Sequence, residues 1–119
     1  MHTTLIVARH LPGSEGEIAR LFAASDATGL PAEIGVHTRK LFTFHDVYIH
    51  LVESPAPVGA AIDKAHGNPE FQRLSTALDA YIQPFAGSWG TAERASARQF
   101  YQWERGRGVV LAPQADPGR

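Results

Sequence analysis

The chain has 119 residues, of which 44% are hydrophobic, so it can form one domain with a single core but not a further domain for a large cofactor. Eleven Lys and Arg residues oppose twelve Asp and Glu residues, which gives a formal net charge of -1. The basic residues are scattered, so nucleic-acid binding has little electrostatic support. Because there is no cysteine, disulfides, thiolate nucleophiles and cysteine-bound metals are excluded.

The segment from Met1 to Arg9 begins without a basic region, and its apolar run is far too short for a signal peptide or a membrane span. We therefore expect a cytoplasmic protein. Residues 3–9 are rich in Leu, Ile and Val without a helical period and end at a Pro–Gly turn, which predicts a buried strand.

A first helix is predicted after this strand. Ser14 is placed to cap it, and the helix should end between Ser25 and Gly29. The pair Leu30–Pro31 predicts extended backbone before the next element, because proline disfavours helical backbone at the residue before it.

Two alternating segments, Gly35–Phe44 and Asp46–Glu53, predict a β-hairpin with a tight turn at His45–Asp46. Neither face of this hairpin is mainly polar. We therefore expect helices to cover one face and a partner subunit to cover the other.

The second half of the chain contains a divided helical region. An alanine-rich helical pattern over 58–66 is interrupted at Gly67–Pro69, and an amphipathic helix follows over 71–82. Residues 84–92 are expected to form a loop, and 97–104 the last strand.

After Glu104 the sequence is rich in glycine and proline and has no periodicity. We expect one domain over residues 1–104, followed by a flexible tail over 105–119 without a further element. The element order β-α-β-β-α-β is that of a ferredoxin-like α+β fold.

The segment from Asp26 to His50 contains most of the candidate chemistry, with three histidines, an arginine and a tyrosine among apolar residues. Groups that hold or move protons between water-excluding walls suit a carbonyl condensation or cyclisation. No pair of histidines at metal-binding spacing has an adjacent carboxylate, and there is no glycine-rich phosphate loop. We therefore expect no metal site.

Several separated motifs together resemble a known family. They are Asp-x-Thr-x-Leu-Pro-x-Glu-Ile-Gly-Val from Asp26 to Val36, Leu-Phe-x-Phe-His-Asp-x-Tyr-x-His-Leu from Leu41 to Leu51, Asn-Pro-x-Phe at 68–71 and Phe-Tyr-x-Trp at 100–103. This set is similar to the small aromatic polyketide cyclases of the tetracenomycin type, over about residues 4–103.

The resemblance implies a ferredoxin-like monomer whose sheet pairs with that of a second copy in a homodimeric α+β barrel. It also implies cyclisation, with loss of water, of a poly-β-ketone or a partly cyclised aromatic polyketide, without metal or organic cofactor. Polyketide synthase components are further candidate partners. The catalytic residues that carry over are Asp26, Arg39 and His50.

One position departs from the family pattern. Tetracenomycin-type sequences carry a histidine directly before the aspartate, and this chain has Ser25 there. The base could then be His37, which shares a strand face with Arg39, or the substrate's own acidity could suffice. We assign substrate contacts to four residues, namely His37, Tyr48, Ser25 and Trp89.

Each of these residues also has an ordinary structural explanation. Arg39 could pair with an acid such as Glu33 or Glu53, and His50 could be a buried histidine satisfied by one hydrogen bond. As an acid or base, His50 would titrate near neutral pH. Asp26 could cap a helix.

Tyr48 could pack against its neighbours without contacting a substrate. The aromatic residues toward the C-terminus could line a pocket, but most are expected in the core, because a small domain needs them for burial. They are Phe85, Trp89, Phe100, Tyr101 and Trp103.

Two other functions remain open beside the cyclase. The same fold hosts cofactor-independent monooxygenases that act on anthrones, and a non-catalytic protein could steer the folding of a polyketide. Product mass separates the enzymes, because oxygenation adds oxygen whereas cyclisation loses water or leaves the mass unchanged.

Overall fold

A computed structural model of the chain describes residues 1–85 and 95–113, and it confirms the ferredoxin-like α+β fold. The antiparallel sheet has the order β2-β3-β1-β4. Its strands are β1 (His2–His10), β2 (Thr38–Phe44), β3 (Val47–Ser54) and β4 (Ile82–Pro84).

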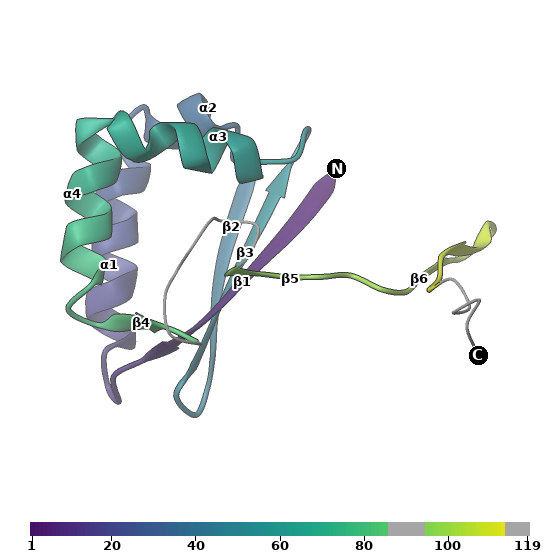
Figure 1. The fold of residues 1–119 in the computed structure, drawn as a ribbon, viewed down its shortest axis with the longest axis horizontal. Helices are drawn as coiled ribbons and strands as arrows, with labels where there is room; N and C mark the ends of the chain where they lie inside the picture. The colour runs from purple at the N-terminus through teal and green to yellow at the C-terminus, as the bar shows by residue number, and fades with distance from the viewer. Residues whose placement is uncertain (86–94, 114–119) are drawn as a thin grey trace, which may run out of the picture.

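The long helices α1 (Glu15–Asp26) and α4 (Pro69–Leu78) cover one face of the sheet (Figure 1). The shorter helices α2 (Leu30–Ile34) and α3 (Gly59–Lys64) lie together at one end of this layer, and a 3₁₀ turn at Ala65–Gly67 leads into α4. No helix among residues 1–85 and 95–113 is long and apolar enough to cross a membrane.

The predicted hairpin is confirmed, with Phe44 opposite Val47 across the turn His45–Asp46. His45 has a φ of 54°, as tight hairpin turns require. Along β3 every second side chain is buried, so strand alternation gives the sheet a helix-covered face and an open face. The core joins Ala8 and Tyr48 of the covered face to Ile18 and Phe22 of α1.

The expectation of extended backbone at Leu30–Pro31 is wrong, because these residues begin α2. Proline fits the first turn of a helix, where the missing N–H would have had no partner. Gly35, with a φ of 93°, then ends the helix in the left-handed conformation that glycine adopts without strain.

The predicted last strand over 97–104 is also wrong. Its place beside β1 is taken first by β4, with Pro84 opposite Ala8, and then by β5 (Ser96–Ala97), with Ser96 opposite Ile6. Ile82 comes soon after α4 and is buried, so β4 pairs with the end of β1 at Ala8–His10, and Ala97 pairs with Leu5 further along the same edge. Beyond Ala97 the chain leaves the sheet (Figure 1).

The expectation that no element follows Glu104 is wrong as well. Strands β6 (Gln102–Glu104) and β7 (Gly108–Leu111) form a separate antiparallel pair. Gly106 and Gly108 have φ angles of 86° and 76°, so glycines that suggested a tail form a turn instead. That a domain ends at Glu104 stays a prediction.

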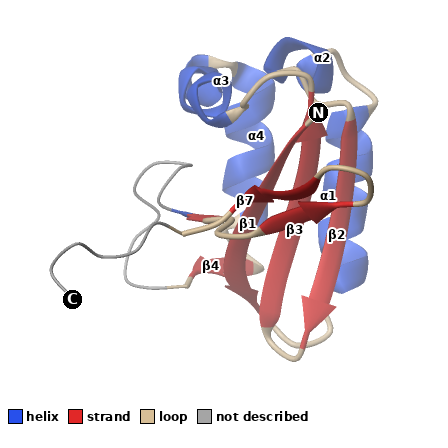
Figure 2. Ribbon diagram, turned by 90° about the vertical axis from the view of Figure 1, so that its right-hand side faces the viewer, coloured by secondary structure: helices blue, strands red, loops and turns tan. Residues whose placement is uncertain are grey.

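The chain from residue 98 to β7, which we call the arm, projects from the open face of the sheet, opposite the helices (Figures 1 and 2). The expectation that most C-terminal aromatics are core is wrong for the single chain. The exposed fractions are 50% for Phe85, 64% for Phe100, 54% for Tyr101 and 57% for Trp103. Trp89 lies outside the described residues.

Removal of residues 105–119 should leave the domain folded. Strand β7 pairs with β6 and not with the main sheet, so its loss exposes little of the core. We expect an unchanged circular dichroism spectrum and a melting temperature within about 5 °C of the full chain. A larger fall would show that the hairpin stabilises the domain.

Candidate functional site

A cavity of about 260 Å³ lies between the covered face of the sheet and the helices. Most of its lining is apolar, with side chains from the sheet and from the helical layer. The polar side chains of the lining are few: Arg39, Tyr48, His50, His66, Ser75 and Asp79. An apolar cavity with a few placed polar groups is the usual form of a small-molecule site.

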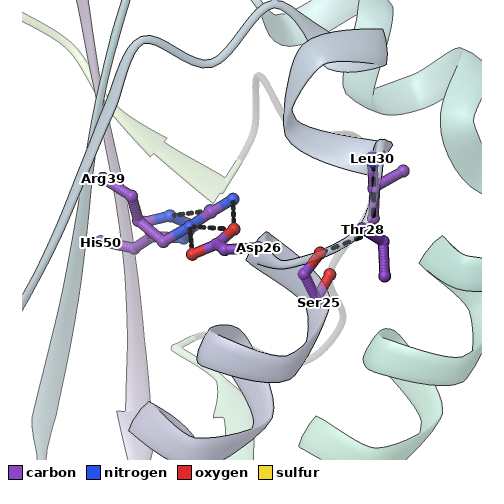
Figure 3. A network of polar contacts seen from close by, with 6 residues as sticks. All are labelled: Ser25, Asp26, Thr28, Leu30, Arg39 and His50. Atoms are coloured by element: carbon purple, nitrogen blue, oxygen red, sulfur yellow. Dashed lines mark hydrogen bonds and ion pairs between the residues drawn. The ribbon is translucent and has the colours of Figure 1, made fainter.

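Arg39 of β2 reaches across to Asp26, the last residue of α1 (Figure 3). Its Nη2 donates to Oδ1 of Asp26 at 2.8 Å, and its Nε donates to Oδ2 at 3.0 Å. This two-pronged contact fixes the plane of the guanidinium, whose side chain is only 14% exposed. The ring of Phe22 lies 4.8 Å from the guanidinium carbon and supports it from one side.

His50 of β3 completes this cluster. Nη1 of Arg39 lies 2.7 Å from Nε2 of His50. Because a guanidinium only donates, Nε2 must accept with its lone pair, and the ring proton then resides on Nδ1. The edge-to-face contact with Phe22, at a centroid separation of 5.1 Å, holds the imidazole in this orientation.

The expectation that His50 titrates near neutral pH is wrong. Burial, and secondly the positive charge of Arg39, lower the pKa of His50 to about 3. The ring is therefore neutral at physiological pH, and its basic nitrogen is occupied by Arg39. In this arrangement His50 positions the guanidinium and is a poor general base.

The cluster leaves part of Arg39 available to a ligand. A guanidinium has five N–H groups, and three of those of Arg39 point at Asp26 and His50. The other two have no partner among the described residues. Because Arg39 lines the cavity, they can donate to a ligand oxygen there.

Tyr48 stands two residues before His50 on the same strand face and also lines the cavity. Its ring centroid lies 6.0 Å from that of His50. Within the described part of the chain its hydroxyl has no hydrogen-bond partner. Burial raises the pKa of Tyr48 more than the charge of Arg39 lowers it, so the hydroxyl stays protonated and can donate.

Two other predicted contact residues, Ser25 and His37, do not line this cavity. Ser25 is buried in α1, and its Oγ has no hydrogen-bond partner among residues 1–85 and 95–113. His37 is exposed and precedes β2, and its backbone N–H donates to the carbonyl of Glu53 at 2.8 Å. Because β2 begins only at Thr38, strand alternation does not carry His37 to the face of Arg39. Trp89 is outside the described residues.

The structural alternatives are also decided by these contacts. Arg39 pairs with Asp26 and not with Glu33 or Glu53. Asp26 is at the C-terminal end of α1, where a carboxylate does not cap, and it serves as the counter-ion of Arg39. The resemblance named Asp26, Arg39 and His50 together, and the structure brings their side chains into contact, which spacing alone did not predict.

Sequence reasoning missed three polar residues of the cavity, His66, Ser75 and Asp79, of which His66 is the histidine. His66 lies in the 3₁₀ turn before α4, and nothing in the local sequence marks it except its imidazole. Among the described residues, no group of three or more His, Asp or Glu side chains could hold a metal ion.

Comparison of the sequence with known protein families identifies the family of this chain. The sequence profile described as "Polyketide synthesis cyclase" matches residues 2–104. The chain belongs to this family. The prediction made from the motifs is thus confirmed, and the arm beyond Glu104 lies outside the match.

Three similar proteins support the assignment of this chain to the polyketide cyclase family. An uncharacterised protein of Streptomyces coelicolor is 45% identical over 88% of this chain and 96% of its own. The polyketide synthase CurG of Streptomyces cyaneus is 44% identical over 88% of this chain and 99% of its own. Tetracenomycin F2 cyclase of Streptomyces glaucescens is 36% identical over 86% of this chain and 94% of its own.

The solved structure of tetracenomycin F2 cyclase also superimposes on this cyclase. The match has a TM-score of 0.81 and covers 87% of this chain and 98% of the other. The fold is therefore that of a polyketide cyclase.

The buried His50 should make the stability of this cyclase depend on pH. In the unfolded chain, His50 is protonated below its ordinary pKa of 6.5, whereas in the folded chain it stays neutral until about pH 3. The free energy of unfolding should therefore fall, as pH drops from 6.5 toward 3, by roughly 1 kcal/mol per pH unit from this residue. Chemical denaturation at several pH values measures the slope.

The His50→Gln variant is the control, because it retains an acceptor for Arg39 but does not titrate. Its stability should fall less steeply over the same range. Parallel curves for the two proteins would contradict the burial of a neutral His50.

Proposed function

We propose that this cyclase closes a ring of a poly-β-ketone by intramolecular aldol addition followed by loss of water, on the way to an aromatic product. The observation that carries the proposal is the guanidinium of Arg39, held between Asp26 and His50, with two free N–H donors at an apolar cavity. The names of the relatives support the substrate class, since one is a tetracenomycin F2 cyclase.

The chemistry needs little from the protein beyond placement and charge stabilisation. A methylene between two carbonyls is already acidic, and its enolate attacks a carbonyl further along the same chain. The oxygen of the attacked carbonyl becomes negative as the new carbon–carbon bond forms. The fixed N–H donors of Arg39 can stabilise that oxygen without having to reorient.

Tyr48 supplies a second donor on the same wall. Its hydroxyl stays protonated and has no partner in the described part of the chain, so a substrate carbonyl or enol oxygen can accept from it. The apolar remainder of the lining excludes water and leaves the ketones few alternative partners. Which carbonyl reaches Arg39 is then decided by the shape of the cavity.

The proposal predicts graded losses for two conservative variants. Arg39→Lys keeps the charge but loses the planar fork, and we expect ring closure to slow by about 10- to 1000-fold. Tyr48→Phe removes one neutral donor, and we expect a loss of about tenfold at little cost in stability. Product formation from a poly-β-ketone precursor and thermal melting check both variants.

Ala24→Glu, an exposed substitution on α1 that leaves the cavity unchanged, is the matched control and should keep the wild-type rate. If the wild-type protein closes the ring no faster than buffer alone, the result would indicate a non-catalytic protein that steers the folding of the polyketide. A product heavier by oxygen would indicate a monooxygenase. Normal rates for Arg39→Lys and Tyr48→Phe would mean that cavity shape, not these donors, directs the ring closure.

We further propose that the cyclase works as a homodimer through the open face of its sheet. Phe42 and Phe44 on that face are 50% and 66% exposed in the single chain. The arm projects from the same face and exposes Phe100, Tyr101 and Trp103. Apolar patches of this kind are unusual on a monomer, and a second copy offers the same patch in return.

Sedimentation at micromolar concentration should give about twice the 12.9 kDa mass of one chain. Phe42→Glu places a charge in the proposed interface and should shift the protein toward monomer. Ala24→Glu adds the same charge on the helical layer and should leave the dimer intact. A single species of one-chain mass in the wild type would contradict the proposal.

A further inference from the structure

We propose that His66 is the proton acceptor of this cyclase. The proposal rests on the aldol ring closure proposed above. It gives the removal of the substrate proton to His66, a residue outside the family motifs, because His50 is badly placed to accept that proton. His66 lies in the 3₁₀ turn between α3 and α4 and is part of the cavity lining. Its side chain is also exposed, so the imidazole stands where the cavity meets solvent.

The hydrogen bonds of His66 fix which nitrogen is basic. Nδ1 lies 3.0 Å from the carbonyl oxygen of Asp63 and 3.2 Å from that of Ile62. A carbonyl only accepts, so the ring proton must be on Nδ1. Nε2 then carries the lone pair and has no hydrogen-bond partner among the described residues.

The imidazole is also held in place. Its ring packs on Phe71, another cavity-lining residue, at a centroid separation of 5.0 Å. The backbone carbonyl of His66 accepts from Nε2 of Gln72 at 2.8 Å, which ties the turn to α4. A base with a fixed tautomer and a fixed ring plane needs no reorganisation before it takes a proton.

Three other ionisable groups near the cavity, His50, Tyr48 and Asp26, are less suited to this step. The lone pair of His50 is occupied by Arg39, and Tyr48 holds its own proton. The carboxylate of Asp26 is engaged by Nε and Nη2 of Arg39. Asp79 also lines the cavity. Asp79 follows the C-terminal end of α4, and His66 precedes its N-terminal end, so the two residues lie at different ends of this helix. Asp79 is therefore a second candidate for the base, which variants of the two residues distinguish.

The proposed step is balanced without an oxidant or co-reactant. Nε2 of His66 takes a proton from a methylene between two ketones, and the electron pair of the broken C–H bond forms the enolate. The enolate carbon bonds to a second carbonyl carbon, whose π electrons move to its oxygen. That oxygen receives a proton from the imidazolium, and later loss of water forms the carbon–carbon double bond.

The experiment compares single variants in ring closure and in exchange of substrate methylene deuterium with solvent. His66→Asn keeps a side-chain N–H near the carbonyls of the turn but removes the basic nitrogen. It should slow both reactions by about 100-fold, the usual contribution of a general base. His45→Asn, in the turn between β2 and β3 and outside the cavity lining, is the matched control and should retain the wild-type rate. Melting temperatures verify that the variants are folded.

A second variant tests whether His66 acts chemically or only shapes the turn. His66→Ala should recover at least tenfold in rate when free imidazole is added, and Asp79→Asn should stay near wild type. A rate within twofold of wild type for His66→Asn would overturn the proposal while leaving the proposed function intact. A loss in Asp79→Asn without a loss in His66→Asn would transfer the role to Asp79. If wild-type protein does not accelerate ring closure over buffer, the proposed function itself fails, and this role with it.

Discussion

The partly buried guanidinium of Arg39 is the constraint on which the rest of the site depends. Its side chain is only 14% exposed, and a cation so placed is costly unless it is paired. Asp26 supplies the counter-charge from the end of α1, and His50 supplies a neutral acceptor from the neighbouring strand. The contact therefore joins α1 to the strands β2 and β3 as well as building the cavity wall.

Burial, more than the charge of Arg39, determines the protonation of the neighbouring His50 and Tyr48. Together with burial, that charge keeps His50 neutral, so the imidazole accepts from Arg39 and does not repel it. Tyr48 is protonated because its burial outweighs the attraction of the cation for a phenolate. The described strand residues of this wall thus present donors to a substrate oxygen, while the lone pair of His50 is occupied and Tyr48 keeps its proton.

The two faces of the sheet carry different features of the molecule. The covered face, with its core of Ala8 and Tyr48, carries the cavity under the helices. The open face carries Phe42 and Phe44 and stands beside the arm. Since strand residues alternate, each polar residue of the cavity wall has neighbours in sequence that belong to the open face. Substitutions in the hairpin therefore have to be interpreted for both faces.

The sequence by itself determined the ferredoxin-like order, the hairpin with its turn at His45–Asp46, and the motifs that contain Asp26 and His50; Arg39, between two of these motifs, followed from the resemblance. These features depend on alternation, on turn residues and on local motifs, all of which are visible in short windows. The helical start at Leu30–Pro31 was missed because the restriction before a proline is only a preference, and a first helical turn tolerates it.

Only the tertiary structure decided which segments pair with the edge of β1, where β4 lies beside Ala8–His10 and β5 beside Leu5–Ile6. It also decided that Arg39 pairs with Asp26, that His50 does not titrate near neutral pH, and that His66 reaches the cavity. These outcomes depend on burial and on contacts between residues far apart in the chain. Residue identity and spacing do not contain that information.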